Sequence, residues 1–126
     1  MKQAILSMLK MQEEMNARVH DSWRDQNFEW YRAIWIECAE LMDHYGYKWW
    51  KHQEPDEAQV QLEIVDIWHF GMSCLLQSER DQEDLASKIA SSWREQRSGS
   101  NFRDIVEALA AETLNNRTFS ISIFSE

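Results

Sequence analysis

The segment from residue 56 to residue 77 constrains the fold of this chain most, because it is apolar on most sides of the helix that its spacing predicts. Its large apolar side chains are Leu62, Ile64, Val65, Ile67, Trp68, Phe70, Met72, Leu75 and Leu76. A helix of this kind needs cover on several sides, so it belongs in the centre of a packed bundle. We therefore expect the rest of the chain to supply helices that pack around it.

Apolar residues recur every three or four positions in four other parts of the sequence, which is the period of a half-buried helix. The predicted helices cover about residues 3–19, about residues 28–45, a segment marked by Leu85, Ile89 and Trp93 that ends near residues 98–100, and about residues 102–114. With 3 Gly and 1 Pro in 126 residues, the chain has too few turn formers for a β-sandwich. We expect one all-α domain over residues 1–126, a four- to five-helix bundle.

Residues that favour helix ends separate these segments. Asn27, Asp56 and Asn101 each precede a predicted helix, where an N-cap side chain accepts a hydrogen bond from the first turn. Gly46 follows the second predicted helix, where glycine commonly ends a helix with a positive φ. The tail from residue 118 to residue 124 alternates apolar and polar side chains, and we expect it to be the one strand-like stretch.

The balance of charge excludes one class of partner. Lys and Arg total 13 and Asp and Glu total 22, so the formal net charge is −9 and opposes binding to a nucleic acid polymer. No run approaches the roughly 18 apolar residues of a membrane-spanning helix, and we expect no secretory signal. The two cysteines, Cys38 and Cys74, make no disulfide framework. We therefore expect a cytoplasmic protein with no membrane partner.

Two pairs of acidic residues fall where an unpartnered charge is costly. Glu37 and Glu40 are three residues apart on the second predicted helix, and Glu63 and Asp66 repeat that spacing on the third. Residues three apart lie on one side of a helix, so each helix presents two carboxylates. No Lys or Arg lies between residues 56 and 77 to neutralise the second pair. Either a hard divalent cation such as Mg²⁺ neutralises the carboxylates, or they lie on a solvated helix edge.

The loop between the two acidic pairs contains Lys48 and Lys51 among the aromatic residues Tyr47, Trp49 and Trp50. Lysines beside a metal site suit the oxygens of a phosphate group, because an ammonium group acts as a point charge. The same pattern also fits a surface loop whose lysine stems cover aromatic side chains while their charges stay in water.

Gln12 and Asn16 lie four residues apart on the apolar side of the first predicted helix. Amides on a core-facing line need hydrogen-bond partners. Either they bond to another helix, or they bind the edge of a pyrimidine base. His69 follows Asp66 by three residues on the same side of its helix, where it can be a core histidine, support a metal ligand or bind a metal itself.

Taken in order, these motifs resemble the signature of the all-α dimeric dUTPases, which belong with the MazG-like nucleotide pyrophosphohydrolases. That signature is an ExxE motif followed after a variable gap by ExxD. Here it reads ECAEL at residues 37–41, KWWK at 48–51 and EIVDIWHF at 63–70, preceded by MLKMQEEMN at 8–16. The resemblance covers about residues 8–76. Longer members carry further motifs in a C-terminal half that this sequence does not match, so we expect either a short or truncated member or a different specificity.

The resemblance implies the helical bundle of the all-α NTP pyrophosphohydrolases. It also implies Mg²⁺-dependent hydrolysis of dUTP, and in this family often of dUDP, to dUMP. By position, Glu40, Glu63 and Asp66 would bind the metal, and Glu37 would bind the metal or orient the attacking water as the catalytic residue.

The resemblance also implies a set of residues around the nucleotide. These residues are Gln12 and Asn16 at the uracil ring, Lys48 and Lys51 near the phosphates, and His69 and Trp50 in the same motifs. Two other functions fit the sequence: a MazG-like pyrophosphatase for another nucleoside triphosphate, and a non-catalytic helical assembly module. For all three functions we expect a homodimer or a higher homo-oligomer, because a helix that is apolar on most sides needs more cover than this chain provides.

Overall fold

The computed structural model describes residues 1–93 and 99–126, and every regular element in those residues is helical. The elements are α1 (Lys2–Val19), the 3-10 helix η1 (Trp23–Asp25), α2 (Trp30–Tyr45), α3 (Glu57–Ser78), α4 (Gln82–Ser92), α5 (Phe102–Asn116) and α6 (Ile121–Phe124). This order confirms the predicted all-α fold. The fourth helix was expected to end near residues 98–100, but α4 ends earlier, at Ser92; residues 99 and 100 are not helical, and residue 98 lies outside the described residues.

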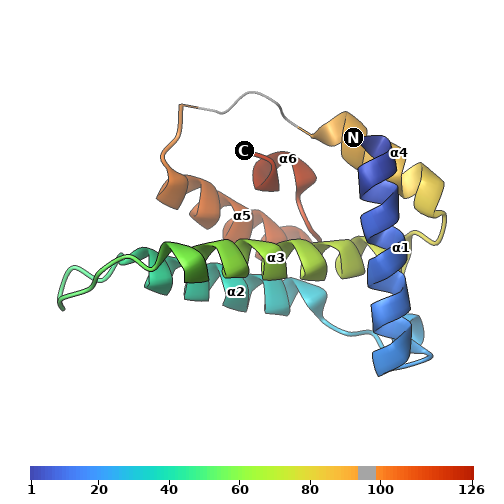
Figure 1. The fold of residues 1–126 in the computed structure, drawn as a ribbon, viewed down its shortest axis with the longest axis horizontal. Helices are drawn as coiled ribbons and strands as arrows, with labels where there is room; N and C mark the ends of the chain where they lie inside the picture. The colour runs from blue at the N-terminus through green and yellow to red at the C-terminus, as the bar shows by residue number, and fades with distance from the viewer. Residues whose placement is uncertain (94–98) are drawn as a thin grey trace.

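α2 and α3 run antiparallel and side by side, and α1 crosses this pair near one end (Figure 1). α4 packs against α1, α5 packs against α2, and α6 contacts both α4 and α5. The core between the helices contains the fully buried apolar side chains Leu9, Ile34, Leu41, Ile67, Leu76 and Ile89. Each of these side chains belongs to a stripe of apolar residues that recur every three or four positions along its helix. Burial of these stripes therefore holds the helices together.

The helix α3 is less completely covered than its sequence predicts. It contacts α1, α2 and α4, but Leu62 and Val65 remain 54% and 47% exposed. On the opposite side the contact is close, because a Cβ atom at Gly71 would stand 2.6–2.7 Å from ring atoms of Phe119. Glycine therefore lets the ring of Phe119 lie directly on the backbone of α3, and this contact positions the chain before α6.

Three of the four predicted helix ends are confirmed. The side chains of Asp56 and Asn101 accept hydrogen bonds from the first turns of α3 and α5, and Gly46 ends α2 with a φ of 88°. The prediction of Asn27 as an N-cap is wrong, because α2 begins at Trp30, with Glu29 before it. Asn27 instead has a φ of 53°, a left-handed conformation that asparagine tolerates in turns.

The prediction of a strand in the C-terminal tail is also wrong. The tail has no strand beside it in the described residues, so a strand there would have had no hydrogen-bonding partner. It forms the short helix α6, and its apolar side chains cover tryptophans instead. The ring of Phe124 stacks on Trp68 at 5.5 Å between centroids and meets Trp93 edge-on.

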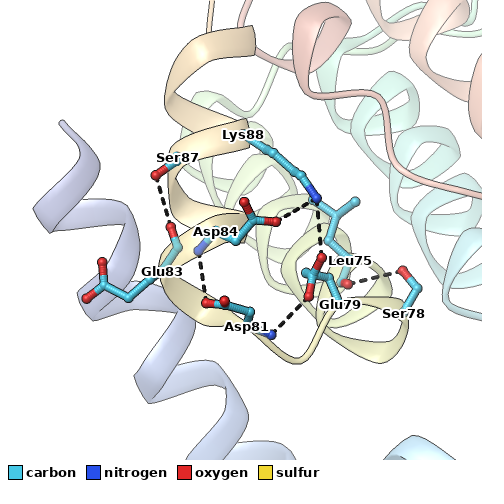
Figure 2. Close-up of polar contacts among 8 residues, drawn as sticks. All are labelled: Leu75, Ser78, Glu79, Asp81, Glu83, Asp84, Ser87 and Lys88. Carbon is cyan, nitrogen blue, oxygen red and sulfur yellow. Dashed lines mark hydrogen bonds and ion pairs between the residues drawn. The ribbon is translucent and has the colours of Figure 1, made fainter.

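The turn between α3 and α4 is held by a network of polar contacts (Figure 2). Asp81 caps α4 by accepting a hydrogen bond from the backbone of Asp84, while its own N–H donates to Glu79. Lys88 forms ion pairs with both Glu79 and Asp84, at 3.3 and 2.7 Å. These contacts orient α4, which then packs along α1. No helix in the described part of the chain is long and apolar enough to cross a membrane.

Candidate metal centre and adjoining cavity

Three carboxyl groups meet where α2 and α3 lie side by side. Glu37 projects from α2, and Glu63 and Asp66 project from α3, one turn apart. One oxygen of each side chain lies within 4.8 Å of an oxygen of the other two. The antiparallel packing of two helices, each with a three-residue acidic spacing, therefore gathers the three carboxylates into one cluster, called here the acidic cluster.

The acidic cluster is unfavourable as a set of bare anions. Glu63 is only 6% exposed, and Oε2 of both Glu37 and Glu63 is buried without a hydrogen-bond partner among the described residues. The pKa of Glu37 is raised to about 8. The largest cause is burial, followed by a hydrogen bond with Glu63 and by the charges of Glu40, Glu63 and Asp66.

These orphaned oxygens fit a divalent cation. Carboxylate oxygens are the ligands that Mg²⁺ prefers, and a cation would pair the charges that burial leaves uncompensated. No lysine or arginine forms an ion pair with the acidic cluster in the described part of the chain. The donor set, three carboxylates from two adjacent helices, therefore suits Mg²⁺.

Glu40 lies outside the acidic cluster, although it is one turn from Glu37. Its side chain is exposed, and it lines an open depression on α2 together with Asp43 and Lys48. Its charge still reaches the cluster, since it contributes to the raised pKa of Glu37. The structure therefore places Glu40 beside the predicted metal site, on its solvent side.

His44 is a neighbour of the acidic cluster that the sequence analysis missed. Its Nε2 atom stands 3.6 Å from Oε1 of Glu63. The signal was present in the sequence, because His44 follows Glu37 by seven residues and Glu40 by four, which puts all three on one side of α2. At this distance the two side chains are in contact without a hydrogen bond, so His44 lies beside the acidic cluster.

A cavity of about 290 Å³ adjoins the acidic cluster and shares Asp66 with it. Gln12 and Asn16 line this cavity from α1, and His69 lines it from α3. Aromatic and aliphatic side chains complete its wall: Met15, Val19, Trp23, Phe28, Trp30 and Phe70. The helices α1 and α3 thus bring Gln12, Asn16 and His69 to one cavity beside Asp66.

The two amides in this cavity also have partners within the protein. Gln12 Nε2 donates to Asn16 Oδ1 at 3.0 Å, and Asn16 Nδ2 donates to Ser73 Oγ of α3 at 2.9 Å. The sequence left open whether these amides bond to another helix or face a ligand. The structure shows the helix–helix hydrogen bond and, at the same residues, a cavity.

The loop between α2 and α3 lies at the end of this helix pair away from α1 (Figure 1). Lys48 forms an ion pair with Asp43 at 2.9 Å, and Lys51 is exposed and helps to lower the pKa of Asp43, after Lys48 and Gln53. Trp50 is 58% exposed and meets Trp49 edge-on. The structure therefore does not bring these three predicted residues into the cavity that Gln12 and Asn16 line.

Comparison with known proteins identifies the family. A family model described as dUTPase matches residues 4–124, which is nearly the whole chain. No curated protein matches the sequence at a significant level. Because the match spans the acidic cluster and the cavity, and the described elements are all helical, the chain belongs to the dUTPase family in its all-α form.

Proposed function

We propose that this chain is an Mg²⁺-dependent dUTP diphosphatase that converts dUTP to dUMP and pyrophosphate. Membership of the dUTPase family supports a function of the dUTP diphosphatase type. The observation that carries the metal dependence is the acidic cluster, in which two buried carboxylate oxygens lack a partner. The same site would also accept dUDP, which has the same base and sugar and one phosphate fewer.

Glu37, Glu63 and Asp66 would hold Mg²⁺, with Glu40 completing the set from the solvent side. The bound cation supplies charge neutralisation for the phosphate oxygens and for the leaving pyrophosphate. Glu63 would contribute a ligand whose position is set by its burial, with His44 in contact beside it.

Glu37 would act on the attacking water. Its carboxylate would orient the water and take its proton while the water oxygen bonds to a phosphorus atom and the phosphoanhydride bond between dUMP and pyrophosphate breaks. The raised pKa of Glu37 belongs to the metal-free protein, and a bound cation would lower it, so that the carboxylate is ionised and able to orient the water.

The base would occupy the cavity lined by Gln12, Asn16 and His69. Its volume of about 290 Å³ is at the small end of ligand sites, which hold roughly 300–1,000 Å³, so it suits a single pyrimidine ring. The phosphates would then extend past Asp66 along the acidic cluster. The phosphate groups would be contacted by Lys48, Lys51 and Trp50. Lys48 would first have to break its ion pair with Asp43.

A second copy of the chain would cover the exposed apolar surface beside this site. An apolar groove of about 330 Å³ runs between α1 and α3 and is lined by Ala4, Met8, Val65 and Trp68 among others. Exposed apolar surface of this kind marks interaction sites, and a symmetric homodimer is the commonest way to bury it.

Product analysis tests the proposal. The chain is incubated with dUTP and Mg²⁺, and we expect dUMP and pyrophosphate in equal amounts. Glu63→Gln should lower the rate by more than about 100-fold, because it removes a charged ligand. Glu107→Gln, at an exposed position on α5, is the matched control and should retain the rate. Equal turnover of dUTP, dCTP and dTTP would instead identify a pyrophosphatase without base preference, and absence of turnover would refute the enzyme.

A further inference from the structure

Ser73 connects the two amides of the cavity to the backbone of α3. Its hydroxyl group donates to the carbonyl oxygen of His69 at 3.0 Å and accepts from Asn16 Nδ2 at 2.9 Å. Asn16 in turn accepts from Gln12 Nε2 at 3.0 Å. Ser73 is fully buried and Gln12 and Asn16 are more than nine-tenths buried, so water does not compete strongly for these bonds.

The direction of each hydrogen bond in this chain follows from the one before it. A serine hydroxyl has a single proton, and Ser73 gives it to a carbonyl oxygen that can only accept. Toward Asn16 the hydroxyl can therefore only accept, so Asn16 must present its NH₂ group. That choice turns Oδ1 of Asn16 toward Gln12, which must then present its own NH₂ group. One helix carbonyl thus fixes the orientation of two side-chain amides.

The fixed orientation decides what the cavity offers to a ligand. An amide has one acceptor oxygen and two N–H donors, so Gln12 retains Oε1 and one N–H, and Asn16 retains one N–H. Together the two side chains keep one acceptor and two N–H donors. Uracil presents the complementary edge, an N3–H donor flanked by two carbonyl acceptors, whereas cytosine presents an N3 acceptor and an amino donor. An amide that is free to rotate could satisfy either base, but a fixed one cannot.

We propose that Ser73 is a specificity-determining positioning residue, which fixes the amides of Gln12 and Asn16 in the order that favours uracil over cytosine. This inference rests on the proposed function, because it assumes that a pyrimidine base occupies the cavity. Ser73 itself need not touch the nucleotide.

The test compares Ser73→Ala with Thr113→Val. Thr113 lies on α5, is fully buried, and has a hydroxyl without a hydrogen-bond partner among the described residues, so its variant controls for loss of a buried hydroxyl alone. The measurements are the ratio of kcat/KM for dUTP to that for dCTP, and calorimetric binding of dUMP and dCMP. Ser73→Ala should lower both the activity ratio and the binding ratio roughly tenfold, through KM rather than kcat, since one orienting hydrogen bond is lost. Thr113→Val should leave both ratios unchanged.

The outcomes separate this inference from the proposed function. If the natural sequence prefers dUTP and Ser73→Ala keeps that preference, the inference is wrong while the proposed function stands. If the natural sequence does not hydrolyse dUTP, the proposed function fails first. Ser73→Cys, whose sulfur is a weak hydrogen-bond partner, is expected to lower the ratios as well and replaces Ser73→Ala if that variant does not fold.

Discussion

At the scale of single residues, the negative charge of Glu37 is strongly disfavoured in the metal-free protein. Its pKa is raised to about 8, first by burial and then by the neighbouring carboxyl groups, of which Glu63 is the closest partner. A proton therefore stays on the acidic cluster at pH values where an ordinary glutamate has lost it. Protons and metal ions compete for such a site.

The raised pKa of Glu37 predicts how the stability of the metal-free protein changes with pH. Folded Glu37 holds its proton more tightly than the unfolded chain does, so its contribution to stability is complete below pH 4.5, the ordinary pKa of a glutamate. That contribution is lost as the pH rises toward about 8. In the presence of EDTA we expect the midpoint of thermal unfolding to fall over this range, and to fall less in Glu37→Gln. Saturating Mg²⁺ should reduce the loss. If the midpoint of thermal unfolding depends on pH in the same way for the natural sequence and for Glu37→Gln, the raised pKa does not belong to Glu37.

The sequence predicted the acidic residues of the site but not their separate environments. The three-residue spacing places Glu37 and Glu40 on one side of a helix, yet it does not decide how far each side chain is turned toward α3. That depends on the crossing of two helices, which buries Glu63 and leaves Glu40 exposed. His44 was missed for a related reason, since its contact with Glu63 exists only after α2 and α3 pack.

At the scale of elements, Gly71 sets the distance between α3 and the chain before α6. A side chain at this position would overlap the ring of Phe119, which is buried and flanked by Trp68 and Phe124. The ring cannot move without disturbing its aromatic neighbours. Packing at this point is therefore specified by the absence of a Cβ atom.

Gly71→Ala is predicted to destabilise the chain by about 1–3 kcal/mol, the usual cost of overpacking a core. Thermal or urea denaturation measures this loss. Gly99→Ala is the matched control, because a Cβ atom at Gly99 would meet no heavy atom of the described residues within 4 Å. Equal stability of the two variants would mean that the contact of Phe119 with α3 is not a packing constraint.

The sequence predicted helix ends best, because a single residue can begin or end a helix. Asp56, Asn101 and Gly46 act on their own first or last turns, and each was predicted correctly. The tail failed because its alternating pattern is ambiguous without knowledge of its neighbours. Its apolar side chains face Trp68 of α3 and Trp93, the residue that follows α4, and the spacing of residues in the tail cannot predict a contact with segments so far away in the sequence.

At the scale of the whole molecule, the apolar groove between α1 and α3 predicts self-association. We expect sedimentation equilibrium at micromolar concentration to show a homodimer. Ala4→Glu places a charge in the groove, away from the acidic cluster, and should shift the equilibrium toward monomer. Ala108→Glu makes the same change at an exposed position on α5 and should not. A monomeric natural sequence would contradict the prediction.

The central claim concerns the whole fold as a scaffold for one cation: two helices pack antiparallel and thereby hold carboxylates that need a metal. Calorimetric titration of the metal-free protein with Mg²⁺ tests it most directly. The account predicts binding to the natural sequence and to Glu107→Gln, with affinity at least about tenfold weaker in Glu63→Gln. Equal Mg²⁺ affinity in all three proteins, or no binding to the natural sequence, would contradict it.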